Sequence, residues 1–182
     1  MKKYFIFLFI LIFSSEVSAS IKDNIIKNLE SIENLSFNFE QNINGKIENG
    51  NCKLEYPKKI FCEYNQKNKK QLISNGRSLV IKTSNSFYIY PIEKTPLNLI
   101  LDKEFILTNI KNLDQRIIDN KYINFAFFHN ENQINIFFDK KNYNLIGWQN
   151  VDIYQNISIT YLNSIKKNQK FKKDLFRLPS PN

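Results

Sequence analysis

The spacing of hydrophobic residues begins with a helical pattern. Between Ser20 and Ile32, hydrophobic residues recur every three or four positions, which predicts an amphipathic helix. Its buried face is expected to contain four residues: Ile21, Ile25, Leu29 and Ile32. Ser20 stands at the N-cap position, and Asp23 follows three residues later, which is close to a capping box.

From Leu35 onward the hydrophobic period changes to two residues, the period of a half-buried β-strand. In this first segment Leu35, Phe37 and Phe39 alternate with polar residues. Strand-like segments then follow at short spacing: residues 47–56, 59–65, 70–75, 77–83, 86–91, 114–118, 121–128, 133–139, 144–152 and 155–164. The dipeptide Asn75-Gly76 predicts a two-residue hairpin turn.

The middle of the chain, "EKTPLNLILDKEFI" at residues 93–106, departs from the alternation. Pro96 marks a helix start and Thr95 is its expected cap. A dense apolar patch follows: Leu97, Leu99, Ile100 and Leu101. A small helical turn is also expected at residues 172–176.

These elements predict a mainly β protein with some α-helix. The N-terminal helix and a short apolar helix must share a core with about 10–11 antiparallel strands, and one strongly curved sheet wrapped around the helices satisfies this requirement. A curved sheet with an apolar concave face can enclose a hydrophobic ligand.

The N-terminus has the three parts of a secretory signal peptide. Two lysines precede an apolar run from Tyr4 to Phe13, and Val17 and Ala19 occupy the small-residue positions before a cut after Ala19. The alternative, a transmembrane anchor, needs about 20 apolar residues. We therefore expect residues 1–19 to be a cleaved signal peptide and residues 20–182 to form one exported, periplasmic domain.

The formal net charge of +9 is weak evidence for a partner. Asn, Ile, Lys and Phe are all heavily used, as is typical of an AT-rich genome, so part of the basicity follows from codon usage. A basic surface could meet anionic lipid or nucleic acid. No nucleic-acid-binding motif is present in the sequence, and export also argues against a nucleic-acid partner.

Catalytic chemistry has little support in the sequence. His129 is the only histidine, and there is no G-x-S-x-G elbow, H-E-x-x-H motif or phosphate-binding glycine loop. Glu63 and Asp152 fall in separate strands, where nothing pairs them. We expect no catalytic residue, no metal site and no cofactor, with a hydrolase using His129 as the weakest alternative.

The two cysteines, Cys52 and Cys62, flank a turn at residues 56–58. They could form a disulfide, half a metal site or a redox pair. One histidine and a spacing of ten residues argue against the last two readings. Antiparallel pairing across the turn predicts three cross-strand pairs on one apolar face: Leu54 with Ile60, Cys52 with Cys62, and Gly50 with Tyr64. In an exported chain this register favours a disulfide, although a shift of one residue would separate the sulfurs.

An ordered set of segments resembles the family of periplasmic outer-membrane lipoprotein carriers, LolA. The segments are "SFNFEQ", "YPKKIFCEY", "LISNGRSLVIK", "TPLNLIL", "GWQNVDIYQNISITY" and "DLFRLPSP". The resemblance covers nearly the whole chain after residue 19. It implies an unclosed β-barrel of about eleven strands, with helices as a lid over an apolar cavity.

The resemblance also implies a function and partners. Family carriers take lipoprotein acyl chains from an inner-membrane ABC transporter and hand them to an outer-membrane lipoprotein receptor of the same fold. The absence of a cysteine near the predicted cut favours the soluble carrier, which we expect to be a monomer. The alternative keeps the fold but changes the cargo, giving a periplasmic binding protein or envelope sensor for another lipid or glycolipid.

The resemblance and the hydrophobic pattern together suggest ten lipid-binding residues. They are Leu35, Phe37, Phe39, Ile60, Tyr64, Leu79, Ile81, Leu97, Ile100 and Leu101. For each residue alone, ordinary core packing is an equally good interpretation. The prediction therefore concerns the set.

Five residues near the turn are interpreted from the family pattern. An arginine before the hairpin proline holds the lid in the family, but Tyr56 stands there, so Tyr56, Lys58 or Lys59 is expected to replace it. Ile60 is expected to dock the transporter, and Cys62 stands where a tryptophan often lines the cavity.

Two further residues match the family pattern near the C-terminal strands. Trp148 and Asp152 are interpreted as structural.

Overall fold

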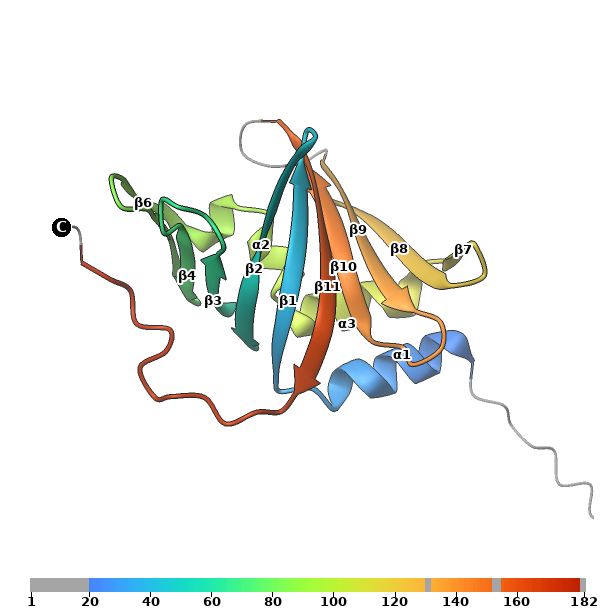
Figure 1. The fold of residues 1–182 in the computed structure, drawn as a ribbon. Coiled ribbons are helices and arrows are strands. Elements are labelled where there is room, and N and C mark those ends of the chain that lie inside the picture. Colours follow the sequence, from blue (N-terminus) through green and yellow to red (C-terminus); the bar gives the residue numbers. More distant parts are fainter. Residues whose placement is uncertain (1–19, 130–131, 152–154, 181–182) are drawn as a thin grey trace, which may run out of the picture.

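The computed structural model describes residues 20–129, 132–151 and 155–180. The predicted signal peptide and Asp152 lie outside the described residues. The described chain forms an eleven-stranded antiparallel sheet that does not close on itself, with α-helices on its concave side (Figure 1). The prediction of a curved, mainly β fold around helices is confirmed.

The elements follow one another with short connections. In chain order they are α1 (Ile21–Glu30), β1 (Asn34–Ile43), β2 (Lys46–Glu55), β3 (Lys59–Tyr64), β4 (Gln71–Asn75), β5 (Ser78–Lys82), β6 (Phe87–Pro91), the 3-10 helix η1 (Ile92–Lys94), α2 (Leu97–Ile100), α3 (Lys103–Asn112), β7 (Arg116–Ile118), β8 (Tyr122–His129), β9 (Asn132–Asp139), β10 (Leu145–Val151) and β11 (Ile157–Lys167).

The strand order is β6-β5-β4-β3-β2-β1-β11-β10-β9-β8-β7. Every neighbouring pair except one joins strands that are consecutive in the sequence. The exception is β1 with β11, where Phe39 pairs with Leu162 and Gln41 pairs with Thr160. This seam joins two meanders, β1–β6 and β7–β11, into one sheet.

Helix α1 begins as its sequence predicts. The Ser20 hydroxyl accepts a hydrogen bond from the Asp23 N–H, and the Asp23 carboxylate accepts one from the Ser20 N–H, each at 3.1 Å. This reciprocal pair is a capping box. Ile25 and Leu29 are fully buried, so the predicted apolar face is the packed face.

The β2–β3 hairpin has the predicted register. Leu54 pairs with Ile60, Cys52 with Cys62, and Gly50 with Tyr64. The turn at residues 56–58 fixes this register, because residues at equal distances from the turn on the two strands lie opposite each other.

Two turn predictions need correction. The loop between β4 and β5 consists of Gly76 and Arg77 rather than Asn75 and Gly76, since Ser74 pairs with Leu79. Asn75 ends β4 and closes the loop, because its side-chain oxygen accepts from the N–H groups of Arg77 and Ser78 at 3.0 Å. The predicted helical turn at residues 172–176 is a hydrogen-bonded turn with no helix.

The segment at residues 93–106 also differs from the prediction. Thr95 does not cap α2, because its hydroxyl donates to the Ile92 carbonyl at 2.8 Å and the N-cap residue is Pro96. Helix α3 was not predicted as a separate element. Asp102 starts it by accepting from the N–H of Phe105 at 3.1 Å.

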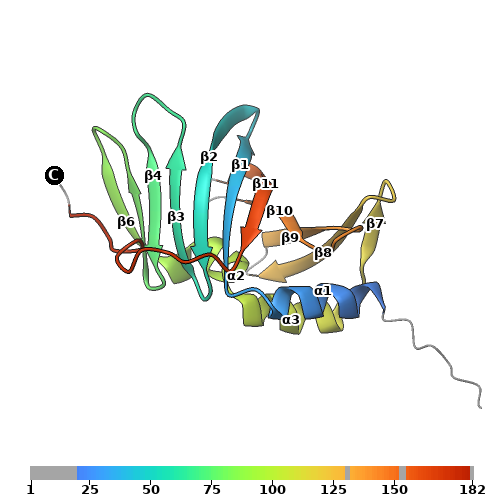
Figure 2. The same ribbon diagram turned by 60° about the horizontal axis from the view of Figure 1, so that its bottom comes forward.

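Helices α1 and α3 lie side by side and cover one part of the concave face (Figures 1 and 2). We call this core the α1–α3 region. Its fully buried members include Ile25, Leu29, Ile106, Ile110, Phe125 and Phe138. The Phe105 ring of α3 meets the Phe127 ring of β8 edge-on, with centroids 5.3 Å apart. The side chains of this region are therefore closely packed against one another.

The C-terminal segment covers part of the opposite, outer face. Ile73 and Val80 are a cross-strand pair that is out of phase with the cavity-lining Leu72 and Leu79, yet both are buried. Figure 2 shows the segment after β11 running across the strands β2 to β4. Phe176 in this segment is 9% exposed, and its ring meets the Phe171 ring edge-on with centroids 6.0 Å apart.

Candidate ligand-binding cavity

A cavity of about 250 Å³ lies between the concave face and α2. Most of its lining is apolar: Phe37, Phe39, Ile43, Cys52, Ile60, Cys62, Tyr64, Leu72, Leu79, Ile81, Tyr90, Pro96, Leu97 and Trp148. Its polar lining residues are Gln41, Lys70, Thr95, Asn150, Ser158 and Thr160. We call these walls, together with α2, the cavity region.

Seven of the ten residues expected to contact lipid line this cavity: Phe37, Phe39, Ile60, Tyr64, Leu79, Ile81 and Leu97. The other three, Leu35, Ile100 and Leu101, are at most 1% exposed and belong to the packed core. Leu35 stands at the start of β1, and the last two stand at the end of α2. The cavity therefore begins one alternation step later along β1 than the hydrophobic pattern suggests.

The disulfide between Cys52 and Cys62 lies in the wall of the cavity. The two Cα atoms are 4.1 Å apart across the β2–β3 ladder. Among the described residues there is no free cysteine. The predicted disulfide is confirmed, and it joins two strands that carry lining side chains on either side of it.

Gly50 allows two aromatic rings to meet across β2. Phe39, Gly50 and Tyr64 stand opposite one another on three neighbouring strands. A Cβ on Gly50 would lie 2.7 Å from the Phe39 ring and 2.1 Å from the Glu63 carbonyl oxygen. Because that atom is absent, the Phe39 and Tyr64 rings pack edge-on at 4.9 Å between centroids.

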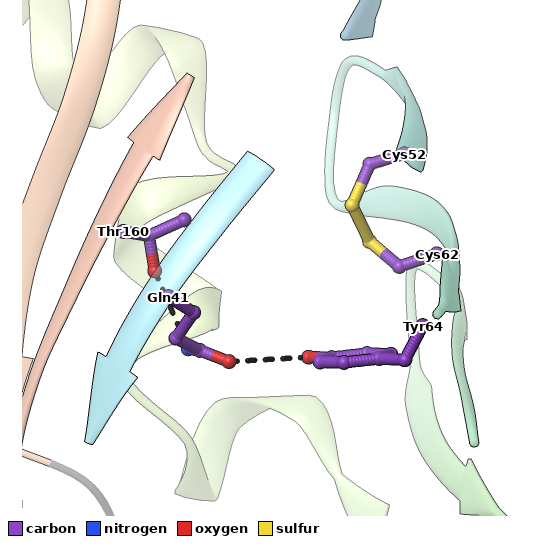
Figure 3. Close-up of a disulfide and its surroundings, with 5 residues drawn as sticks. All are labelled: Gln41, Cys52, Cys62, Tyr64 and Thr160. Carbon is purple, nitrogen blue, oxygen red and sulfur yellow. Dashed lines mark hydrogen bonds between the residues drawn. A yellow bond between two sulfur atoms is a disulfide. The ribbon is translucent and has the colours of Figure 1, made fainter. Parts of the chain in front are cut away.

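One end of the cavity is polar. The Gln41 amide N–H groups donate to Ser158 at 3.0 Å and to Thr160 at 3.3 Å, and the Tyr64 hydroxyl donates to the Gln41 oxygen at 3.3 Å. Figure 3 shows Gln41 and Tyr64 pointing toward one another, with the disulfide beside Tyr64. Burial, and next the charge of Glu48, raise the pKa of Tyr64, so this hydroxyl stays protonated and donates.

A buried ion pair adjoins the polar end. The Lys70 ammonium donates to the Glu48 carboxylate, and the Glu48 side chain is 3% exposed. The same ammonium lies 4.1 Å from the centre of the Tyr64 ring. Burial would raise the pKa of Glu48, but hydrogen bonds, first that from Lys70, outweigh it and lower this pKa to about 2. Glu48 is therefore ionised at neutral pH and its charge is balanced within the protein.

A comparison of the chain with models of protein families identifies its family. The model described as "Outer membrane lipoprotein carrier protein LolA" matches residues 30–179. The chain belongs to the LolA family. No curated protein matches the chain in a sequence comparison.

Solved structures similar to this LolA-family chain are distant in sequence. A LolA superfamily protein from Nitrosomonas europaea has 7% identity and a TM-score of 0.47, covering 88% of this chain and 99% of the other. A DUF1329 family protein from Desulfovibrio piger has 9% identity and a TM-score of 0.42, covering 86% and 95%. A domain named for outer membrane lipoprotein sorting, from Vibrio parahaemolyticus, has 8% identity and a TM-score of 0.41, covering 84% and 94%.

Lys58 connects the hairpin turn with the junction between α2 and α3. Its ammonium lies 3.0 Å from the carboxylate of Asp102, and its backbone N–H donates to the Leu101 carbonyl at 2.9 Å. Lys59 instead pairs with Glu55 at 2.6 Å. Of the three residues expected at this latch of the LolA family, Lys58 is the one whose ammonium lies on the α2–α3 junction.

Tyr56, expected as one substitute for the family's arginine, makes no hydrogen bond through its hydroxyl to the helices that the structure describes. Its hydroxyl is buried and has no hydrogen-bond partner among the described residues. Burial raises the pKa of this hydroxyl. The Lys103 ammonium lies 5.7 Å from the centre of the Tyr56 ring, so the ring contacts α3 by its face rather than by its hydroxyl.

Three other residues singled out in the sequence are placed as follows. Ile60 is 2% exposed, so docking to a transporter would require it to leave the cavity wall. Trp148, interpreted as structural, lines the cavity. The His129 side chain lies outside the described residues.

The polar lining was not predicted, although one signal for it exists. Along β11, Ser158 and Thr160 are buried while Tyr161 is exposed, so the apolar residues of this stretch face outward. Leu162 is in phase with the two hydroxyl residues and is buried. Alternation counted back from Leu162 would have placed Ser158 and Thr160 on the inward face of the strand.

Two general features of the LolA-family chain concern membranes and metals. None of the helices within residues 20–129, 132–151 and 155–180 has the length and hydrophobicity needed to cross a bilayer. In the same part of the chain, no three His, Cys, Asp or Glu side chains gather as metal ligands do.

Proposed function

We propose that this chain is a periplasmic carrier that binds the acyl chains of lipoproteins in its cavity. It takes them from an inner-membrane ABC transporter and carries them toward the outer membrane, where a lipoprotein receptor, if present, accepts them. In this proposal residues 1–19 are a cleaved signal peptide, and residues 20–182 are the carrier domain, acting as a monomer without a cofactor and not as an enzyme.

The cavity is the observation that carries the proposal. It is mostly apolar, it lies under a short helix, and it occurs on a LolA-family fold. Each methylene group kept from water contributes about 0.8 kcal/mol. A single long acyl chain therefore needs an apolar site to cross an aqueous compartment.

The lid contacts suit a carrier that must also release its cargo. Helix α2 is four residues long, and the Lys58–Asp102 pair beside it is partly exposed. Such pairs contribute about 0.2–1 kcal/mol. Weak lid contacts let a bound acyl chain replace them, and they let the lid close again after release.

Release of lipoprotein from membranes tests this function. The purified mature chain is incubated with ATP and inner-membrane vesicles that contain the transporter and a radiolabelled lipoprotein, and the supernatant is analysed for a soluble complex. We expect lipoprotein to appear there with the carrier. Leu97→Glu, which places a charge in the cavity lining, should abolish release, whereas Tyr161→Glu on the outward face of β11 should not.

A different cargo would give a different result. If no lipoprotein is released while the same preparation binds purified glycolipid, the lipoprotein carrier is excluded. The other function on this fold, a binding protein or sensor for another lipid, then replaces it.

A further inference from the structure

The polar end of the cavity is built from strands on both sides of the β1–β11 seam. Ser158 and Thr160 are 2% and 4% exposed, and both lie beside Gln41 on the concave face. Polar side chains this deeply buried normally have a hydrogen-bonding task. Both of them line the cavity rather than the packed core.

The hydrogen-bond capacity of this cluster is rich in donors. Gln41 uses its two N–H groups on the oxygens of Ser158 and Thr160, so each hydroxyl keeps its own hydrogen to donate. The Lys70 ammonium has three N–H groups and makes one hydrogen bond to Glu48. A ligand group that fits here must therefore accept hydrogen bonds.

The charge of the cluster favours a neutral ligand group. Lys70 is the cation that lines the cavity, and Glu48 pairs with it. Lys46, 3.0 Å from the same carboxylate, is mostly exposed to solvent. An anionic group would meet the carboxylate of Glu48 as well as the ammonium of Lys70, and would lose its hydration without gaining a free cation.

We propose that Ser158, Thr160 and Lys70 form a head-group site for an uncharged acceptor oxygen, namely the ester or amide carbonyl that links an acyl chain to its carrier molecule. The acyl chain then extends toward Leu79 and Leu97 at the apolar end. This inference rests on the proposed function as far as acyl chains are concerned. It adds a fixed orientation and a selection by head group.

Displacement of an uncharged fluorophore tests the site. The purified chain is loaded with phenylnaphthylamine, which has no carbonyl group, and is titrated with three ligands of equal chain length: monolauroylglycerol, dodecanol and laurate. We expect the ester to bind about tenfold more tightly than the alcohol, the effect of one or two buried hydrogen bonds. Laurate should bind more weakly than the ester.

Two variants separate the ends of the cavity. Ser158→Ala combined with Thr160→Val should reduce the preference for ester over alcohol to about twofold or less, because the donors are lost. Its unchanged affinity for phenylnaphthylamine would show that the cavity is intact. Leu79→Ala should weaken the binding of ester and alcohol by the same factor and leave the preference for the ester unchanged. Thr160→Val alone is the fallback if the double variant does not fold.

The possible results of these experiments bear on the head-group site and on the carrier function separately. A preference that survives in the double variant, or tighter binding of laurate than of the ester, overturns the head-group site. Failure of every ligand and the fluorophore to bind overturns both the site and the carrier function. If ester preference depends on the two hydroxyls but lipoprotein is not released from vesicles, the head-group site stands and lipoprotein is removed as the cargo.

Discussion

The α1–α3 region and the cavity region share one concave face but are filled differently. Two ten-residue helices cover the first, and four of their side chains, Ile25, Leu29, Ile106 and Ile110, are at most 1% exposed. A four-residue helix covers the second, and about 250 Å³ stays open. Both regions lie on one sheet and the helix over the cavity is the shorter one, so we attribute the open space to this shorter cover.

A matched pair of leucines tests this difference most strongly. Leu29→Ala removes a side chain from the α1–α3 region and should lower the free energy of unfolding by about 3–4 kcal/mol, because a new void is created. Leu79→Ala only enlarges an existing cavity, so its loss should be about 1–2 kcal/mol. Urea unfolding measures both. Equal losses would contradict the distinction between the two regions.

The disulfide should stabilise the cavity region in place of packing. Cys52→Ala with Cys62→Ala opens a ten-residue cross-link and should lower the free energy of unfolding by about 2–3 kcal/mol. In the same urea experiment, reductant should lower the free energy of unfolding of the wild type by a similar amount and leave that of the variant unchanged. A wild type that is insensitive to reductant would show that the cross-link does not stabilise this wall.

The Glu48–Lys70 pair makes the cavity region sensitive to acid. The folded pKa of Glu48, about 2, lies below its unfolded value of 4.5. The unfolded chain therefore binds the proton first as pH falls. Stability on the order of 3 kcal/mol is present above pH about 5 and is lost as pH falls toward about 2. Glu48→Gln should show a flatter dependence of unfolding free energy on pH in this window. Parallel curves for the two proteins would argue against the pair.

The smallest effect is expected at the lid. Lys58→Met removes the ion pair with Asp102 and should lower the free energy of unfolding by only about 0.5–1 kcal/mol. Amide hydrogen exchange should accelerate in α2 and remain unchanged in α1. Lys59→Met, which breaks the pair with Glu55, is the control and should leave exchange in α2 unaltered.

Local sequence patterns predicted the fold well because most paired strands are consecutive in the sequence. The capping box at Ser20 and the register between Cys52 and Cys62 depend on residues within a few positions of a turn or helix start. Helix α3 escaped prediction because its sequence continues the apolar segment of α2, and the break between them is a single capping residue, Asp102.

The site was predicted less completely, for a physical reason. Alternation shows which side chains face inward, but it does not show what covers them. Leu35 and Phe37 have the same pattern, yet only Phe37 reaches the cavity. Inward-facing polar residues such as Gln41 and Thr160 are hidden from a hydrophobic count, and their contact across the seam joins residues more than a hundred positions apart.

The β1–β11 seam has a consequence for the order of assembly. All other strand pairs close short loops, so each meander can form by local steps, whereas the seam brings residues 34–43 to residues 157–167 and carries most of the loop-closure entropy. The polar end of the cavity lies across this seam. It therefore comes into being only when the last strand docks, and a ribosome-bound or truncated chain without β11 has no complete cavity to load.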